Sequence, residues 1–285
     1  MSISYLNGSW QPIEDARVSV LDRGFLFGDG VYEVIPVYNQ VPFCLSRHIT
    51  RLCNSLDEIR MPNPLSNSEW TCLIEEAIEK SGEETASLYL QVTRGADVIR
   101  NHVYPEPIEQ TVFLMVSPAP LLAREEIDPY SVVTLDDYRW SMGHIKTVSL
   151  IAACMLKNEA IAQGVNDAIL IRDGLVTESS SSNVFMVLDE VIVTAPKSRY
   201  LLHGITRDVI VELAVANDLA IEERDFTLVE LSEASEIFIS SSIHEAWPVG
   251  VLNNQIVGNG EAGLVWQEVD RLFQAEKKRL TSPEG

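Results

Sequence analysis

Two prolines separated by one residue, Pro118 and Pro120, are the feature that most constrains how this chain of 285 residues can fold. Proline fixes its own φ and disfavours helix in the residue before it, so Pro-Ala-Pro is an extended segment. The segment directly follows strand-like sequence. We therefore expect a linker at residues 118–120, with a second part of the chain that begins near Leu121. A chain of this length suits one large domain or two smaller ones, with ample length to bury a core.

Local patterns in both parts predict helices mixed with strands, which is an α+β fold. The elements expected in the first part are a hairpin around Asn7-Gly8, a strand over 31–38 that resumes at Val41, helices over about 46–59 and 68–80, and strands over 87–93 and 111–117. Those expected in the second part are a strand over 131–135, hairpins over 168–177 and 183–194, a helix that opens at Gly204, and a strand over 237–240.

The acidic balance of the chain narrows its partners. A formal net charge of −21 argues against nucleic acid or an anionic membrane as a partner. No apolar run approaches the roughly 20 residues of a membrane span, and the N-terminus lacks the basic and apolar regions of a secretory signal. The four cysteines are scattered without metal-like spacing. We therefore expect a cytoplasmic protein with reduced thiols and no metal.

Lys146 lies where two predicted elements meet. The β-branched run 131–135 before it predicts a strand. Apolar residues recur after it at helical spacing and predict an amphipathic helix, with Val148, Ile151, Ala152 and Met155 on one face. The backbone at such a junction can present a side chain for chemistry. Taken alone, however, a solvated surface lysine is the more ordinary interpretation.

Four polar clusters offer donors for an anion. They are TESSSSNVF (177–185), HGITRD (203–208), ISSSIHE (239–245) and Arg51 in SRHITRL. The first combines a glutamate with turn-forming hydroxyls, and the second opens a helix, whose free N–H groups suit a phosphate. The serines of the third follow a strand, and Arg51 can pair with phosphate. Taken singly, each is more ordinarily a polar loop, a helix cap, a turn or a solvated arginine.

A lysine, a distant glutamate and several phosphate donors together match the requirements of pyridoxal 5'-phosphate. This cofactor needs a lysine for its Schiff base, a carboxylate facing its pyridine nitrogen and an anchor for its phosphate. The sequence has no P-loop and no dinucleotide fingerprint, because FGDG at 27–30 lacks the spacing of either.

The chain resembles the fold-type IV pyridoxal-phosphate transaminases, and among them the D-amino-acid transaminases, almost from end to end. The motifs that carry the resemblance, in the same order, are DRGFLFGDGVYEV (22–34), HITRL (48–52), QVTRG (91–95), RNH (100–102), IK (145–146), TESSSSNVF and LHGITRDV (202–209). The chain departs from the family at 147–149, at Ser179 in place of glycine, and in a longer segment before Arg100. The resemblance implies an α+β, two-domain architecture in a homodimer. A small α/β domain of about residues 1–117 would precede a larger domain of about residues 122–285, with the cofactor between the domains.

The resemblance also implies roles for single residues. Lys146 would be the Schiff-base lysine and the general acid/base. Glu178 would face the pyridine nitrogen, and Leu202 would pack against the ring. The residues that would hold the phosphate are Arg51, Ile205, Thr206, Ser241 and Ser242. Those that would bind the substrate α-carboxylate are Tyr32, Arg100 and His102, and in this family the Arg-x-His pair points toward D-amino acids.

The implied reaction is the ping-pong transfer of an amino group from a D-amino acid such as D-alanine to a 2-oxo acid such as 2-oxoglutarate. One alternative is a branched-chain L-amino-acid transaminase, which should not need the trap made by Arg100 and His102. A second is an aminodeoxychorismate lyase, which shares the cofactor site but eliminates pyruvate. A third, from another class, is a cofactor-binding or scaffold protein without turnover.

Overall fold

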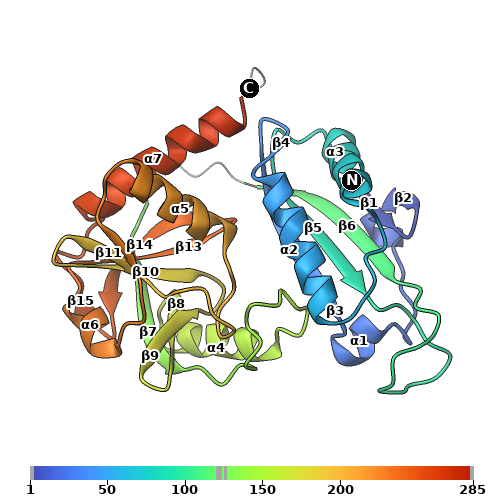
Figure 1. Cartoon of the computed structure of the whole chain (residues 1–285), viewed down its shortest axis with the longest axis horizontal. Helices are drawn as coiled ribbons and strands as arrows, with labels where there is room; N and C mark the ends of the chain where they lie inside the picture. Colours follow the sequence, from blue (N-terminus) through green and yellow to red (C-terminus); the bar gives the residue numbers. More distant parts are fainter. Residues whose placement is uncertain (1–2, 120–123, 125–126, 283–285) are drawn as a thin grey trace. The chain divides into compact units, whose positions relative to one another are not determined.

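The computed structural model describes residues 3–119, 124 and 127–282, and the chain splits into two compact units (Figure 1). Unit 1 is bounded by Met1–Leu121, Ile145–Ser149 and Arg279–Gly285, and unit 2 by Leu122–His144 and Leu150–Lys278. These units differ from the predicted domains 1–117 and 122–285 because two later segments join the N-terminal part. One of those segments contains Lys146.

The predicted linker begins as strand. Pro118 is the last residue of β6 (Thr111–Pro118), and the Ala119 N–H donates to the Thr85 carbonyl at 3.1 Å. The sheet pairing therefore continues through the first two residues of Pro-Ala-Pro. Pro120 lies outside the described residues.

Unit 1 contains a six-stranded antiparallel sheet in the order β2-β1-β6-β5-β3-β4. Its other strands are β1 (Ile3–Leu6), β2 (Ser9–Pro12), β3 (Gly30–Tyr38), β4 (Val41–Pro42) and β5 (Thr85–Thr93). Asn7 and Gly8 join β1 to β2 with φ values of 46° and 92°, the left-handed conformation that a tight hairpin turn requires. The predicted hairpin and strands are confirmed.

Two helices pack on this sheet, α2 (Leu45–Glu58) against β3 and α3 (Asn67–Ser81) against β6 and β1, and they also contact each other (Figure 1). The short helices η1 (Ile13–Asp15) and α1 (Arg23–Phe27) precede β3. A capping box of Ser66 and Glu69 opens α3, and Gly82 ends it. Both predicted helices are confirmed. The buried apolar side chains include Ile49, Leu52, Trp70, Ile74, Leu88, Leu90 and Leu114.

Unit 2 contains a nine-stranded mixed sheet in the order β12-β11-β10-β13-β14-β7-β8-β9, with β15 beside β14. The strands are β7 (Tyr130–Asp136), β8 (Asp167–Arg172), β9 (Leu175–Ser179), β10 (Asn183–Leu188), β11 (Val191–Thr194), β12 (Ile221–Glu223), β13 (Glu236–Ser241), β14 (Glu245–Leu252) and β15 (Gln255–Ile256). The pairs β14–β7, β7–β8 and β11–β12 are parallel. The strands and hairpins predicted for this part are confirmed.

The sheet of unit 2 curls around one apolar core. Val193 of β11 and Val176 of β9, near opposite ends of the strand order, belong to the same buried cluster as Met186 and Ile239. The helices of this unit are α4 (Ile151–Ala162), α5 (Ile205–Ala216), α6 (Leu228–Glu233) and α7 (Leu264–Leu280), whose last residues fall in unit 1. None of the helices that the structure describes is long and apolar enough to cross a membrane.

The predicted helix after Lys146 exists as α4, but the predicted buried face is wrong. Leu156 and Ala160 are the buried residues of α4, and they pack with Ala168 and Leu170 of β8. Ile151 and Met155 of the predicted face are 78% and 57% exposed. The error has a physical reason: Val148, which set the phase of the pattern, precedes the helix and is hydrogen-bonded to the edge of β3.

Candidate active site

Lys146 is held against the edge of the unit 1 sheet. Its carbonyl accepts the Tyr32 N–H at 2.9 Å, and the Val148 N–H donates to the Gly30 carbonyl at 3.0 Å. The Lys146 N–H donates to the Ser55 hydroxyl of α2 at 3.3 Å. These bonds fix the backbone on both sides of the lysine. Its Nζ lies 4.3 Å from the centre of the Tyr32 ring, so two of the predicted site residues meet.

Beneath this segment, α2 turns polar side chains toward β3. His48, Arg51 and Ser55 recur at helical spacing and are all buried. Arg51 Nε and Nη2 donate to the two oxygens of Glu33 at 2.8 and 2.7 Å, and His48 Nδ1 lies 2.7 Å from Glu33 Oε2. Arg51, predicted as a phosphate ligand, therefore forms a two-point ion pair with a buried carboxylate.

The charges in this cluster shift two pKa values. Burial raises the pKa of Glu33, but the Arg51 charge and the hydrogen bonds from Arg51 and His48 outweigh it and lower that pKa to about 2. Burial lowers the pKa of His48, and the positive charges of Arg51 and Lys146 lower it further against the opposing effect of Glu33. At neutral pH the cluster therefore holds an ionised Glu33 and a neutral His48.

Arg100 and His102 lie on the exposed segment between β5 and β6. The Arg100 guanidinium carbon is 4.9 Å from the centre of the Phe27 ring, and the His102 ring centre is 5.2 Å from it. The two side chains predicted to bind a carboxylate thus rest on one aromatic ring. Tyr32, the third predicted member, stacks on Tyr89 with ring centres 5.6 Å apart.

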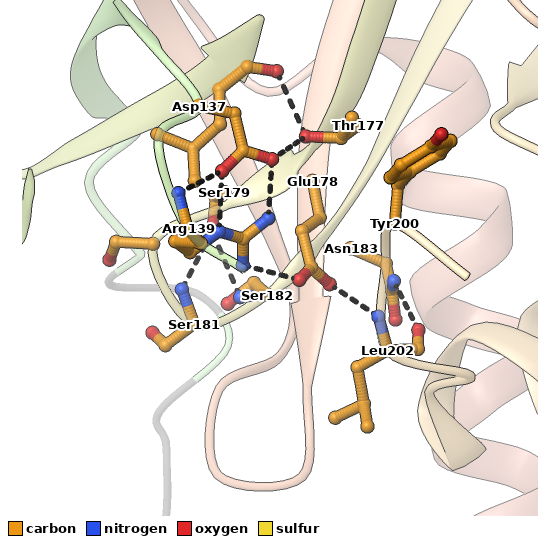
Figure 2. A network of polar contacts seen from close by, with 12 residues as sticks. Asp137, Arg139, Thr177, Glu178, Ser179, Ser181, Ser182, Asn183, Tyr200 and Leu202 are labelled. Atoms are coloured by element: carbon orange, nitrogen blue, oxygen red, sulfur yellow. Dashed lines mark hydrogen bonds and ion pairs between the residues drawn. The ribbon is translucent and has the colours of Figure 1, made fainter. Parts of the chain in front are cut away.

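Glu178, in β9, belongs to a buried polar network of unit 2 (Figure 2). Arg139 Nη1 donates to Glu178 Oε1 at 2.5 Å, and the Leu202 N–H donates to Oε2 at 3.0 Å. Burial raises the pKa of Glu178, and the Arg139 charge and the Leu202 N–H oppose this rise. A carboxylate offers about four lone-pair sites. Glu178 is therefore oriented by two donors and retains capacity for another.

Arg139 is shared between two carboxylates (Figure 2). Its Nε and Nη2 each donate to Asp137 at 2.9 Å, while its Nη1 donates to Glu178. Asp137 also accepts the Thr177 hydroxyl at 3.0 Å and pairs with Arg172 at 3.1 Å. Burial raises the pKa of Asp137, but the hydrogen bonds and charges of the two arginines lower it below its ordinary value.

The serine run after Glu178 forms a tight turn in which Ser179, Ser180 and Ser182 are buried and Ser181 is exposed. The Ser179 N–H donates to the Ser182 carbonyl at 2.6 Å, and the Ser179 Oγ accepts the Ser182 N–H at 2.9 Å. The Ser180 hydroxyl donates to Asp167 at 2.6 Å. At Ser179, where the resembling family has glycine, the hydroxyl itself closes the turn between β9 and β10.

The turn that opens α5 packs tightly on β10. Asn183 Nδ2 donates to the Leu202 carbonyl at 2.9 Å, and a Cβ at Gly204 would lie 2.0 Å from Asn183 Oδ1. Any larger residue at this position would force the Asn183 side chain to move. Within the described part of the chain, no side chain caps the first turn of α5, where Ile205 and Thr206 are buried. Its N–H groups and the Thr206 hydroxyl suit an anion.

Serines of β13 supply further hydroxyl groups in the same unit. Ser241 Oγ accepts the His244 N–H at 3.1 Å. Ser240 Oγ is buried and has no hydrogen-bond partner among the residues that the structure describes. Because buried hydroxyls are normally satisfied, and because α5 packs on β13, this group of donors fits a bound phosphate.

Comparison with known proteins identifies the family of the chain. The family described as amino-transferase class IV matches residues 30–251. The chain belongs to this family. It is 38% identical over 268 residues to a D-alanine aminotransferase of Listeria monocytogenes serotype 1/2a (strain 10403S), with 93% of each chain covered. A D-alanine aminotransferase of Bacillus licheniformis is also 38% identical, over 94% of each chain.

The fold of this aminotransferase is likewise that of a solved structure. A branched-chain amino acid aminotransferase from T.th., with pyridoxamine 5'-phosphate, matches with a TM-score of 0.88 and 26% identity, covering 99% of this chain and 95% of that chain. The predicted family and the predicted α+β, fold-type IV class are therefore confirmed.

The motifs of the sequence indicate no role for four residues of these networks, which are Glu33, His48, Asp137 and Arg139. Glu33 could have been found, because it alternates with Val31 and Ile35 on the apolar side of a predicted strand, and a carboxylate there requires a partner. His48 stands three residues before Arg51, on the same face of a predicted helix. Asp137 and Arg139 follow a strand in irregular chain, and no local signal connects them with Glu178.

Proposed function

We propose that this aminotransferase moves an amino group from D-alanine and related D-amino acids to 2-oxo acids such as 2-oxoglutarate, with pyridoxal 5'-phosphate as cofactor. The observation that carries the proposal is the 4.3 Å approach of Lys146 Nζ to the Tyr32 ring. It joins the lysine proposed for proton transfer to a residue proposed for substrate binding. The two D-alanine aminotransferases at 38% identity support the choice of substrate.

Each unit, taken by itself, offers donors of the kind that the cofactor needs. Lys146 would attach it covalently, Glu178 would accept a hydrogen bond from its protonated ring nitrogen, and Leu202 would pack on its ring. The proposed phosphate ligands are Arg51, Ile205, Thr206, Ser241 and Ser242, with the Ser240 hydroxyl as a further donor. When bound, the cofactor supplies a protonated ring that accepts the electrons left when the substrate loses its α-proton.

Lys146 Nζ performs the proton transfers in this proposal. It takes the α-proton of the substrate and returns a proton later, and the ping-pong sequence repeats this work in both half-reactions. While Nζ is protonated, the face of the Tyr32 ring stabilises its positive charge. The backbone bonds from Tyr32 and Ser55 keep Lys146 in place during the exchange.

Glu178 acts by holding a proton on the ring nitrogen, and Arg139 makes that possible. Without the guanidinium, burial alone would favour a neutral Glu178, which cannot stabilise a neighbouring positive charge. Arg139 and the Leu202 N–H favour the ionised form and fix its direction. Arg139 is therefore a positioning residue that acts through Glu178.

The substrate α-carboxylate would be bound by Arg100, with His102 and Tyr32 completing the site. A charge-assisted hydrogen bond from a guanidinium is the strongest of these contacts. Arg100 and His102 are separated by one residue and share the Phe27 ring, which gives the pair a common support. Such an anchor selects substrates with a carboxylate, and its side of approach selects their handedness.

A branched-chain L-amino-acid transaminase is the second candidate, favoured by the structural match to the solved branched-chain enzyme. Incubating the purified protein with D- and L-alanine or D- and L-leucine, each with 2-oxoglutarate, separates the two. Consumption of the D-alanine and formation of D-glutamate supports the proposal. Preference for L-leucine, with L-glutamate as product, replaces it with the branched-chain activity.

We also propose that the enzyme works as a homodimer in the cytoplasm. Unit 1 exposes large apolar side chains on the segments 18–25 and 98–103. A hydrogen bond from the backbone N–H of Arg23 to the Gly95 carbonyl links the two regions of the chain. The exposed side chains are Val18, Val20, Phe25, Val98, Ile99 and Val103. Exposed apolar side chains in such numbers are typical of an interface with another chain. The four free cysteines agree with a reducing compartment.

Replacing the lysine tests the proposed function directly. Lys146→Ala should abolish transamination and the visible absorbance that the attached cofactor gives to the protein, because no other amine takes over attachment and proton transfer. Lys80→Ala, on the outer side of α3, is the matched control and should keep both properties. A Lys146→Ala protein that keeps colour and turnover would remove the lysine from the proposal.

A further inference from the structure

The segment 97–110 carries both proposed carboxylate ligands, yet most of it is exposed. It joins β5 to β6, and its Arg100 and His102 are both exposed. An exposed segment of this length holds two side chains in a fixed arrangement only if something fixes its backbone. The support comes from α1.

Arg23, the first residue of α1, is only 3% exposed and reaches the backbone of this segment. Its Nη1 donates to the carbonyls of Asn101 and Val103 at 2.5 and 3.3 Å, and its Nη2 donates to the carbonyl of His102 at 3.3 Å. Three successive carbonyls are therefore held by one planar guanidinium. Lysine cannot reproduce this arrangement, because its donors radiate from a single nitrogen.

The guanidinium is itself fixed by Asp29. Arg23 Nε donates to Asp29 Oδ2 at 2.8 Å, and Arg94 Nε contacts both oxygens of the same carboxylate at 2.9 and 3.1 Å. The Arg94 guanidinium also lies 3.6 Å from the centre of the Tyr104 ring, just beyond the three clamped residues. The far side of the segment is thus attached to the same buried cluster.

Phe27, the last residue of α1, supports the side chains. Its ring centre is 4.9 Å from the guanidinium carbons of both Arg23 and Arg100, and 5.2 Å from the His102 ring centre. One short helix therefore holds the backbone of the segment through its first residue and the two proposed ligands through its last.

We infer that Arg23 is a positioning residue for the substrate-carboxylate site: it clamps the backbone at 101–103 and so sets the geometry of Arg100 and His102. The inference rests on the proposed function, because it assigns Arg23 a role through those two ligands. Arg23 itself contacts neither substrate nor cofactor in this proposal. It determines how tightly substrates that carry an α-carboxylate bind.

The first test is kinetic. Arg23→Lys should raise KM for D-alanine by about tenfold or more, the size of a lost charge-assisted contact, and should change kcat less. A primary amine without a carboxylate should keep its kcat/KM. In a background that lacks both ligand side chains, Arg100→Leu with His102→Leu, Arg23→Lys should add no further loss, because the contacts that it positions are already gone. Arg17→Lys, an exposed arginine in the preceding segment, is the matched control.

The second test does not depend on activity. Trypsin cleaves after Arg100, and release of the clamp should accelerate this cleavage several-fold in Arg23→Lys but not in Arg17→Lys. If Arg23→Lys does not fold, as judged by circular dichroism, Phe27→Leu takes its place. The same rise in KM for D-alanine is expected there, with the carboxylate-free amine again unaffected.

The outcomes distinguish a failure of the inference about Arg23 from a failure of the proposed function. Faster cleavage together with a protein that does not use D-alanine keeps the clamp and rejects the proposed function. Unchanged cleavage and unchanged KM in Arg23→Lys overturn the inference. An equal loss on the carboxylate-free amine, or an added loss in the background that lacks both Arg100 and His102, also overturns it by assigning Arg23 a general structural role.

Discussion

A buried carboxylate meets an arginine in each of the two units, yet the two carboxylates have pKa values displaced in opposite directions. In unit 1, Glu33 receives two N–H groups of Arg51 and faces His48, and its pKa falls to about 2. In unit 2, Glu178 receives one N–H of Arg139 and one backbone N–H, and burial raises its pKa.

The two sites differ in how the N–H donors of each guanidinium are distributed between carboxylates. Arg51 turns two nitrogens to Glu33, whereas Arg139 directs two nitrogens to Asp137 and only one to Glu178. Asp137 also places its own negative charge near Glu178. A neighbouring arginine therefore does not by itself fix the ionisation of a buried carboxylate. The number of its donors, and the competitors for them, decide the outcome.

The largest expected effect comes from removing the charge of Glu178, whose partner Arg139 is shared with Asp137. Glu178→Gln should slow proton abstraction by orders of magnitude while the protein still binds cofactor, because a neutral amide cannot hold a proton on the ring nitrogen. Single-turnover absorbance kinetics with D-alanine measure the rate, and titration with the cofactor measures binding. Glu222→Gln, an exposed carboxylate of the same unit, is the control. A rate near that of the wild type in Glu178→Gln would contradict the assigned role.

Removing the charge of Glu33, which receives two donors of Arg51, should mainly lower the stability of the protein. Glu33→Gln leaves the Arg51 guanidinium buried without its counter-charge, which costs about 3 kcal/mol of the free energy of unfolding. Denaturant unfolding at pH 7 measures this. Glu76→Gln, which breaks an exposed pair on α3, should change it by less than about 1 kcal/mol. Equal effects of the two substitutions would mean that burial does not distinguish the pairs.

The pH dependence sharpens the same contrast. The pKa of Glu33 is lowered from 4.5 to about 2, so its contribution to stability is fully present above about 4.5 and is lost as the pH falls toward 2. Glu178 has a raised pKa, so its contribution is present at low pH and is lost as the pH rises through that pKa. Unfolding measured between pH 3 and 7 should therefore flatten in Glu33→Gln and steepen in Glu178→Gln.

The smallest effect is expected from neutralising Asp137, which competes with Glu178 for the donors of Arg139. Asp137→Asn removes a negative charge and weakens the hold on Arg139, so the guanidinium acts more strongly on Glu178. The pKa of Glu178 should fall, and the acidic limb of the single-turnover rate should move to lower pH by less than about one unit. Asp136→Asn, the neighbouring residue, controls for the lost charge. A shift to higher pH would show that Asp137 supports Glu178 through Arg139 and does not compete with it.

Much of the fold could be predicted because its signals are local. The Asn7-Gly8 turn, the alternating strand 31–38 and the glycine that ends α3 each depend on a few adjacent residues. The buried face of α4 could not be predicted in the same way. It depends on which strand the helix meets, and the pattern was set by Val148, which belongs to another element.

For the site, too, the features with a local signal could be predicted and those that depend on distant segments could not. Residue types suggested Lys146, the serine clusters and the start of α5, since each has a local chemical signature. The partners that set their charge come from distant segments: Glu33 and His48 are 15 residues apart, and Arg139 and Glu178 are 39 apart. Helix packing and sheet curvature bring such pairs together, and a single sequence does not encode that packing in any short stretch.

The attachment of 145–149 to the edge of β3 has a consequence for the order of synthesis. The ribosome completes the six strands of unit 1 well before it makes Lys146. The backbone hydrogen bonds of Gly30 and Tyr32 in β3 to the segment 145–149 can therefore form only later. A nascent chain released at the predicted linker would lack that neighbour, the lysine and the C-terminal residues of unit 1. The reactive amine is therefore delivered to its sheet late, and only by a chain that has already begun unit 2.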